Sequence, residues 1–255
     1  MLLCIDIGNS NIGWGIFQKS KLKTFWRTAT VRDKTSDEWG LEASLFLQKL
    51  GAEKLIKKID GIAISSVVPP LNSPFQEMCQ KYFCCSPRFA GESLKIPLSI
   101  STDHPEEVGA DLLVGAYSAF KQYGGPVIVV DFGTATTFSA VSKKGEFLGT
   151  SIAPGIAISA EALFSRAAKL PRVQITAPPS PIGKNTIHCM QSGLLYGFVG
   201  QAEKIIQMIK KELGNNVKVV ATGGLADLIS NETAEIQKVD PNLLLQGLML
   251  LYEKL

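Results

Sequence analysis

The stretch GPVIVVDFGTATTFSAV, residues 125–141, decides the fold, because a run of strand-forming residues stops at Asp131 and then resumes. The apolar run before Asp131 indicates a buried strand, and Gly133 allows the backbone to turn tightly directly after the acid. Backbone N–H groups and threonine hydroxyls in such a turn are donors that suit phosphate oxygens. The stretch therefore predicts a strand, a ligand-binding turn and a second strand.

The amino-terminal stretch LLCIDIGNSNIGWGIF, residues 2–17, repeats this pattern. An apolar strand again ends at an acid, Asp6, and Gly8 follows two positions later, as Gly133 follows Asp131. Each copy continues with further strands and then with helix-spaced apolar residues. We interpret this as an internal duplication of a β-β-β-α unit.

The remaining segments complete an alternation of strands and helices. A Gly-rich turn, ATGG, follows a strand at 217–221 and opens a helix. The apolar carboxyl-terminal segment NLLLQGLMLLYEKL predicts a helix that belongs either to the core or to a subunit interface. The other expected elements are a strand at 22–30, a helix with its N-cap at Ser36 that ends near Gly51, a buried strand at 60–70 closed by two prolines, and a helix at 109–124.

Composition excludes several classes of protein. The chain has 255 residues, is 45 % hydrophobic and 19 % charged, and has a net charge of +3 with scattered basic residues, which argues against a nucleic-acid binder. No apolar run approaches the roughly 18 residues of a membrane span, and the amino terminus does not suit a signal peptide. Five cysteines without a C-x-x-C pair argue against a disulfide framework or a zinc site and favour the reducing cytoplasm.

The two strand-end acids indicate cation chemistry. Asp6 and Asp131 carry the same charge sign as phosphate, so they make sense next to a phosphate mainly through an intervening cation or a polarised water. An alternative interpretation is that each acid only caps its own turn through a local hydrogen bond. The occurrence of both acids at corresponding places favours a nucleotide clamp.

Several motifs in order resemble the type III pantothenate kinases. They are DIGNSNIGWGIF, PEEVGADLLVGAYSAF, VVDFGTATTFSAV, GTSIAPGI, IGKNTIHCMQSGLLYG and ATGG, and together they span nearly the whole chain. That family belongs to the superfamily of acetate kinase, sugar kinases, heat-shock ATPases and actin. The resemblance implies an α/β fold of duplicated ribonuclease H-like (actin-like ATPase) domains with a cleft between them, divided into residues 1–115 and 116–255.

The resemblance also implies a role for individual residues. Asp111 would accept the proton of the primary hydroxyl of pantothenate, Asp131 would bind a monovalent cation, K⁺ or NH₄⁺, and Asp6 would act through Mg²⁺. Thr186 would contact pantothenate across a homodimer interface. The implied ATP contacts are Asp6, Ile7, Gly8, Asn9, Ser10, Asn11, Ile12, Gly13 and Thr134, and the implied pantothenate loop is Gly109, Ala110, Asp111 and Leu112.

The implied activity is phosphorylation of pantothenate by ATP to 4'-phosphopantothenate, the first step toward coenzyme A. The sequence departs from the family pattern at three positions: Leu112 stands where Arg is usual, Ser139 where Asp is usual, and Thr102 where an aromatic residue is common. Two alternatives stay open. One is a non-catalytic regulatory or ligand-binding homologue of the same fold, and the other is a kinase of another small hydroxyl substrate.

Overall fold

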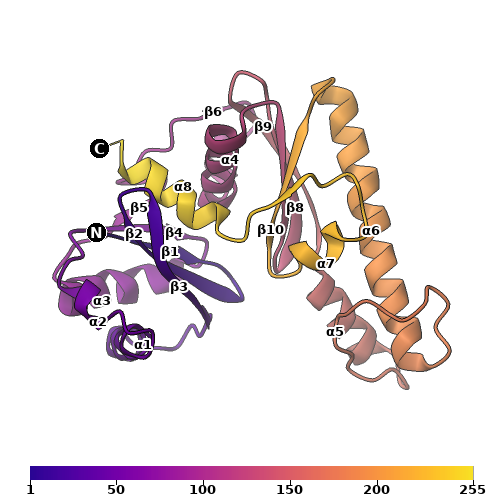
Figure 1. Ribbon diagram of the computed structural model, residues 1–255, viewed down its shortest axis with the longest axis horizontal. Helices are drawn as coiled ribbons and strands as arrows, with labels where there is room; N and C mark the ends of the chain where they lie inside the picture. The colour runs from indigo at the N-terminus through magenta and orange to yellow at the C-terminus, as the bar shows by residue number, and fades with distance from the viewer. Residues whose placement is uncertain (255) are drawn as a thin grey trace. The chain divides into compact units, whose positions relative to one another are not determined.

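The chain divides into two compact units in the computed structural model, which describes residues 1–254 (Figure 1). The first unit contains Met1–Leu98, Glu106–Ser118 and the residues from Asn242 onward, and the second contains Ser99–Pro105 and Ala119–Pro241. These units are groups of residues that pack together. The predicted division into residues 1–115 and 116–255 instead follows the sequence repeat, and it stays a prediction.

The first unit contains a five-stranded sheet with the order β3-β2-β1-β4-β5. The first three strands are antiparallel neighbours, whereas β4 and β5 run parallel to β1. Figure 1 shows α1 and α3 on one side of this sheet and α8 on the other. The elements are β1 (Leu2–Ile7), β2 (Asn11–Gln18), β3 (Lys21–Ala29), α1 (Ser36–Lys49), α2 (Glu53–Ile56), β4 (Gly61–Ser66), a 3-10 turn (Pro69–Leu71), α3 (Asn72–Phe83), β5 (Arg88–Phe89) and α8 (Leu243–Tyr252).

Alternation along β1 determines which way its acid faces. Leu3, Ile5 and Ile7 are fully buried against the α1 and α3 side, where they join Trp39 and Phe75 in one core cluster. Leu2 and Cys4 instead join the cluster formed with α8. Because side chains alternate along a strand, Asp6 belongs to the α8 face.

The second unit repeats the topology of the first. Its sheet has the order β11-β10-β7-β8-β9-β6. The five strands β9-β8-β7-β10-β11 match β3-β2-β1-β4-β5 position by position, and β6 is added at one edge. The parallel and antiparallel pairings also match. The elements are β6 (Ser99–Ile100), β7 (Val127–Phe132), β8 (Ala135–Val141), β9 (Glu146–Pro154), α5 (Ile156–Arg166), α6 (Thr186–Leu213), β10 (Lys218–Gly223), α7 (Ala226–Ser230) and β11 (Lys238–Val239).

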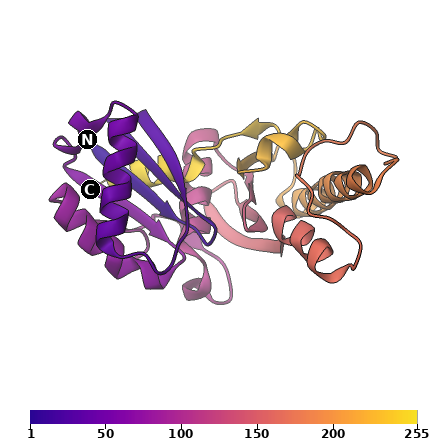
Figure 2. The same cartoon turned by 90° about the horizontal axis from the view of Figure 1, so that it is seen from below.

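Helices α5, α6 and α7 cover one face of the second sheet. Ile128 and Val130 of β7 are fully buried on that face, together with Leu195 and Ile206 of the long helix α6. Figure 2 shows the same helices from below. Asp131 lies between the buried positions Val130 and Phe132, as Asp6 does between Ile5 and Ile7, and both strands share one burial pattern.

Helix α4 (Ala110–Tyr123) begins in the first unit, and its residues from Ala119 onward cluster with the second. A short 3-10 turn, Pro105–Glu107, precedes it. The helix carries Asp111 in its first turn and the buried residues Val114 and Tyr117 one and two turns further on. This spacing places the acid at the beginning of a helix whose inner face is anchored in the α8 core cluster.

The sequence-based expectations for the elements are confirmed with one correction. The N-cap of α1 is Thr35 rather than Ser36, because the Thr35 hydroxyl accepts from Glu38 N–H and the Glu38 carboxylate reaches back to Thr35 N–H. The carboxyl-terminal helix proves to be core, since Leu245 and Leu248 are buried within the first unit. Within residues 1–254, no helix is both long and apolar enough to cross a membrane.

Candidate active site

The first candidate loop follows β1 and is shaped by its own backbone. The N–H of Gly8 donates to the carbonyl oxygen of Asn11 at 3.1 Å, which closes the turn between β1 and β2. A Cβ atom at Gly8 would lie 3.0 Å from that same oxygen, so a side chain there would crowd the turn. Asn9, Ser10 and Asn11 are exposed at the tip, where their polar groups can reach a ligand.

A threonine directly after β3 holds this loop in place. Thr30 donates from Oγ1 to the Gly8 carbonyl at 2.6 Å and from its N–H to the Ser10 carbonyl at 3.0 Å. Arg32 adds a contact from its guanidinium to Oδ1 of Asn9 at 3.3 Å. The loop is therefore tied to the end of β3 as well as to β1, which limits its freedom before any ligand binds.

Three of the predicted ATP contacts, Ile7, Ile12 and Gly13, have no side chain that can reach a ligand. Ile7 and Ile12 are fully buried in the α1 and α3 cluster, so their side chains face away from any ligand and only their backbone groups are available. Gly13 lies beside Asp6 in the sheet, and a Cβ atom there would lie 3.9 Å from the Asp6 Cβ. The same Cβ atom would lie 4.0 Å from Leu245 Cδ2, so Gly13 places no side chain between Asp6 and α8.

The predicted pantothenate loop, Gly109 to Leu112, forms the entry and first turn of α4 and is built around the carboxylate of Asp111. A Cβ atom at Gly109 would lie 2.5 Å from Asp111 Oδ1, so the carboxylate rests where a side chain of any other residue would begin. The N–H of Leu112 donates to the same oxygen at 2.8 Å. Burial raises the pKa of the Asp111 carboxyl, and the N–H groups of Leu112 and of Asp111 itself oppose this only in part.

Both loops of the first unit adjoin the end of β4. Val67 donates its N–H to the carbonyl oxygen of Ile7 at 3.1 Å, directly before the first loop. The same residue's Cγ1 would lie 3.7 Å from a Cβ atom at Gly109. Val67 therefore lies against both the end of β1 and Gly109, and the loop after β1 is next to the start of α4.

In the second unit, Asp131 lies between two threonines in the sheet and close to a glycine. Its in-register neighbours in the sheet are Thr137 on β8 and Thr222 on β10. Gly223 has a φ of +95°, and a Cβ atom there would lie 2.5 Å from Asp131 Oδ1 and 2.6 Å from the carbonyl oxygen of Phe132. Only glycine suits this position, because both the backbone conformation and the space exclude a side chain.

The turn after Asp131 brings further backbone oxygens together. Gly133 donates its N–H to the carbonyl of Ala135 at 3.1 Å, and Thr134 is exposed at the tip. A Cβ atom at Gly155 would collide with the carbonyl oxygens of Gly133 and Thr134. The segment that enters α5 therefore lies directly against the turn, and its glycine permits that approach.

Thr186 lies apart from the Asp131 turn, at the first position of α6. Asn185 precedes it as the N-cap, and the Asn185 Oδ1 accepts from His188 N–H at 2.9 Å. Thr186 is exposed, and so is the adjacent Ile187. The structure thus shows a well-capped helix start with an accessible threonine, and the role of Thr186 toward pantothenate stays a prediction.

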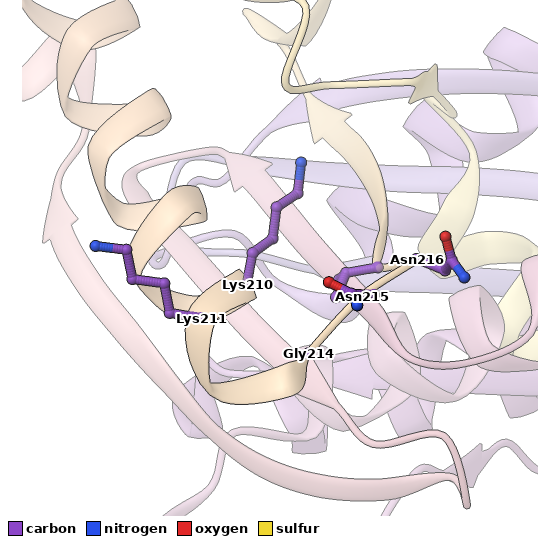
Figure 3. Close-up of a pocket in the computed structure, with 6 residues that line it drawn as sticks. Lys210, Lys211, Gly214, Asn215 and Asn216 are labelled. Carbon is purple, nitrogen blue, oxygen red and sulfur yellow. The ribbon is translucent and has the colours of Figure 1, made fainter.

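A separate hollow of about 410 Å³ lies at the other end of α6 (Figure 3). It is lined by Lys210, Lys211 and the turn Gly214–Val217. The Lys210 ammonium is engaged by the Glu235 carboxylate at 2.5 Å. None of the predicted site residues lies there, and in residues 1–254 no group of three or more His, Cys, Asp or Glu side chains is placed to bind a metal.

Comparison with known proteins decides the family. The sequence profile of the type III pantothenate kinases matches residues 2–208. Type III pantothenate kinases from Moorella thermoacetica and Brevibacillus brevis are each 50 % identical to this chain over 254 residues, which covers 100 % of this chain and 99 % of each relative. The chain belongs to the type III pantothenate kinase family.

The fold also agrees with the prediction. The activator of the 2-hydroxyisocaproyl-CoA dehydratase from Clostridium difficile, solved with bound ADPNP, superimposes with a TM-score of 0.52 at 10 % identity, covering 99 % of this chain and 94 % of that one. Together with the repeated sheet order, this confirms the duplicated ribonuclease H-like, actin-like ATPase fold.

The three departures from the pattern of type III pantothenate kinases have different surroundings. Ser139 is buried on β8, and its hydroxyl is 2.9 Å from that of Thr150 on β9, so the two side chains satisfy each other. Leu112 contributes its N–H to Asp111. Thr102 has a buried hydroxyl without a hydrogen-bond partner among the described residues.

Sequence reasoning missed several residues that lie beside the first loop or beside the two acids. Thr30 and Ser65 carry no motif of their own, and Thr222 belongs to ATGG without being singled out there; what Ser65 and Thr222 lie beside depends on strand register, which a sequence alone does not give. Gly155 and Gly223 carried a signal, since the motifs GTSIAPGI and ATGG contain them. Only the structure shows that Gly155 lies against the turn after Asp131 and that Gly223 lies against Asp131 itself.

Proposed function

We propose that this chain is an ATP-dependent pantothenate kinase that transfers the γ-phosphoryl group of ATP to the primary hydroxyl of pantothenate. The product is 4'-phosphopantothenate, the first intermediate toward coenzyme A. The observation that carries the proposal is identity of 50 % along the full chain with type III pantothenate kinases. Val67, which bonds to Ile7 before the first loop and lies against Gly109 before Asp111, supports it.

Asp111 serves as the proton acceptor. Its carboxylate is held at the beginning of α4 by the Leu112 N–H and by the absence of a side chain at Gly109. Its raised pKa makes it a stronger base than an exposed aspartate, which suits it to receive the hydroxyl proton during transfer. Leu112 completes the loop as its hydrophobic wall, and Ala110 and Gly109 approach pantothenate through their backbone.

The first loop holds the polyphosphate. Asn9, Ser10 and Asn11 supply amide and hydroxyl groups at an exposed tip, and Gly8 and Gly13 supply close backbone approach. A lone carboxylate beside such a loop suits Mg²⁺, which favours one or two carboxylates together with phosphate oxygens and water. When bound, Mg²⁺ neutralises charge on the transferring phosphoryl group. Asp6 would hold it.

The second loop suits a monovalent cation. The carboxylate of Asp131 lies close to the backbone at Phe132 and Gly223, next to a turn whose carbonyl oxygens face the chain at Gly155. Oxygen atoms from a carboxylate and from carbonyls are ligands for a hard cation such as K⁺, and NH₄⁺ can donate hydrogen bonds to the same atoms. Such a cation adds positive charge near the phosphates, and Thr134 contacts ATP from the same turn.

A coupled ADP-release assay tests the activity. With ATP, Mg²⁺ and K⁺, ADP release should depend on added pantothenate, and mass analysis should show pantothenate gaining one phosphoryl group. Pantoate, pantetheine and simple sugars serve as acceptor controls. Faster turnover with another hydroxyl compound would identify a different substrate, and no turnover with any acceptor would contradict the assignment.

A non-catalytic homologue is the second candidate. The burial of Ser139 against Thr150, where the family usually has a carboxylate, is the observation that favours it. Calorimetry separates the two candidates, because a regulator would bind nucleotide and pantothenate without releasing ADP. A measurable turnover that Asp111→Asn removes would exclude the regulator.

A homodimer in which Thr186 reaches the partner's pantothenate site is also part of the proposal. Large apolar side chains are exposed on β9, on α5 and around the start of α6 in the second unit, among them Ile152 at 69 % and Ile182 at 79 %. A surface of this kind is typical of an interface between subunits. The other exposed apolar residues there are Ile158, Leu163 and Ile187.

Mixing two inactive variants tests that arrangement. Asp111→Asn and Thr186→Ala subunits, unfolded and refolded together, should regain about a quarter of the wild-type activity, because half the dimers are mixed and one site in each is intact. Each variant alone should stay inactive. Activity no higher than the sum of the separate variants would show that Thr186 acts within its own subunit or not at all.

The cytoplasm is the proposed location. All five cysteines are free, and Cys4 and Cys79 are buried with pKa values raised by burial, which suits thiols kept as small apolar side chains. Thiols of this kind persist in a reducing compartment. Cell fractionation with an antibody against the chain tests the location directly.

A further inference from the structure

Ser65 on β4 has a hydroxyl that the fold leaves without a hydrogen bond. The residue is 0 % exposed, and its Oγ has no partner among the described residues. A buried polar group without a partner costs free energy, so such a group usually has a reason outside the packing of the core. The position of Ser65 in the sheet supplies one.

Ser65 is the in-register neighbour of Asp6. β4 runs parallel to β1, and Asp6 pairs with Ser65 in that ladder. Residues two positions earlier, Cys4 and Ala63, both join the core cluster formed with α8, so Asp6 and Ser65 belong to the same face of the sheet. On the other side of Asp6, Gly13 carries no side chain.

The second unit repeats this arrangement with different residues. Asp131 pairs with Thr222 of β10, the strand that corresponds to β4, and Thr222 is 2 % exposed. A hydroxyl therefore lies beside the strand-end acid on the parallel neighbour strand in both halves. The turns after the two acids differ in length and composition, yet this pairing is common to both.

We propose that Ser65 is a positioning residue for Asp6, and that its Oγ–H donates a hydrogen bond to the Asp6 carboxylate in the nucleotide-bound enzyme. One carboxylate oxygen is then fixed by Ser65 and the other is directed toward the cation that accompanies ATP. The inference rests on the proposed kinase function. It explains why a donor is buried beside an acid although packing alone would favour alanine.

The test is Ser65→Ala, measured for turnover, for binding and for stability. The value of kcat/KM for MgATP should fall about 10- to 100-fold, as is usual when a partner of a metal ligand is removed, and half-maximal activity should need more Mg²⁺. Calorimetry should show weaker ADP binding with Mg²⁺ and unchanged binding without it. The melting temperature should stay equal or rise, because the variant removes an unpaired buried hydroxyl.

Two further variants separate positioning from packing. Ser65→Thr keeps a hydroxyl, as Thr222 does in the other half, and should retain most of the Mg²⁺-dependent binding. Thr136→Val removes another buried hydroxyl without a partner, on the opposite face of β8 from the Asp131 partner Thr137, and should leave turnover and the Mg²⁺ requirement unchanged.

The outcomes distinguish this inference from the proposed function. If wild-type protein shows no pantothenate-dependent ADP release, the proposed function fails. If wild-type protein is active and Ser65→Ala matches it within about twofold in kcat/KM and in Mg²⁺-linked ADP binding, the positioning role is overturned. A loss of activity that only parallels a fall in melting temperature would also overturn it, because that is the mark of a packing residue.

Discussion

The two strand-end acids occupy the same place in two copies of one scaffold, and they differ in what surrounds them. Asp6 and Asp131 are each the fifth residue of a six-residue strand with the same burial pattern. Asp6 is flanked by Gly13 and Ser65, whereas Asp131 is flanked by Thr137 and Thr222. The strands are repeated in the two units, but the residues that flank the acid on the neighbouring strands differ.

The turns show the same contrast. After Asp6, the turn presents exposed amide and hydroxyl side chains and is tied down by Thr30. After Asp131, the carbonyl oxygens of the turn lie directly against Gly155, and Asp131 Oδ1 and the Phe132 carbonyl oxygen lie against Gly223. This contrast is the basis for proposing that the first turn binds phosphate and that the second acid binds a cation.

The largest expected effect concerns Asp111, which lies outside the repeated pair of strand-end acids. Asp111→Asn should lower kcat about 10²- to 10⁴-fold, because the amide cannot accept the hydroxyl proton. ATP and pantothenate binding by calorimetry should change little. Retention of more than a tenth of wild-type kcat would show that another group accepts the proton.

The same variant has an opposite effect on stability. A carboxyl whose pKa is raised by burial favours the protonated form in the folded state, so its contribution to stability is lost as pH rises through that pKa. Asp111→Asn is permanently neutral and should melt at a higher temperature than wild type at pH 7, with the gap closing at acid pH. Wild-type activity should fall as pH drops through the same pKa, because the base becomes protonated.

The next effect tests how tightly the second acid is enclosed. Gly223→Ala places a Cβ atom 2.5 Å from Asp131 Oδ1 at a φ of +95°, so both the carboxylate and the backbone must move. Activity should fall about 10- to 100-fold and the stimulation by K⁺ should weaken. Gly224→Ala, where a Cβ atom meets nothing within 4 Å, is the control for stability. Equal melting temperatures and equal K⁺ curves for the two variants would contradict the enclosure.

The smallest effect concerns the contact that fixes the first turn. Thr30→Val removes the hydrogen bond to the Gly8 carbonyl and should cost about 1 kcal/mol in the free energy of unfolding. It should also raise KM for ATP a few-fold while kcat stays nearly constant, because the loop must then be ordered by the ligand.

Thr28→Val, two residues earlier and within β3, is the matched control. Its hydroxyl accepts from the Trp14 indole N–H at 3.1 Å inside the core, so its loss should cost about 1–3 kcal/mol without changing KM. If both variants shift KM for ATP by the same factor, general destabilisation rather than loop placement accounts for the effect.

Much of this arrangement could be predicted from the sequence because it depends on local patterns. The apolar runs before Asp6 and Asp131, and the glycine two positions after each acid, indicated the repeated strand and turn, and the two sheets confirm the repeat. Helix α1 was expected one residue late at its N-cap, because Thr35 and Ser36 are both good caps and only the reach of Glu38 decides between them.

What could not be predicted depends on contacts between segments far apart in the sequence. Ser65 and Thr222 gain their meaning from strand register, and Gly155 from its approach to a turn some twenty residues earlier. The apolar carboxyl-terminal helix had two open interpretations, core or interface, and only its burial with Val114 and Tyr117 settles it as core. The roles of the individual site residues stay predictions.

The most direct test of the contrast between the two acids is a two-cation titration of ADP release. Wild type, Asp6→Asn and Asp131→Asn are each assayed with pantothenate across a range of Mg²⁺ at fixed K⁺, and across K⁺ against Na⁺ at fixed Mg²⁺. We expect Asp131→Asn to lose the stimulation by K⁺ while keeping its Mg²⁺ midpoint, and Asp6→Asn to need more Mg²⁺ while still responding to K⁺. An unchanged K⁺ response in Asp131→Asn would contradict the assignment of the second acid to the monovalent cation.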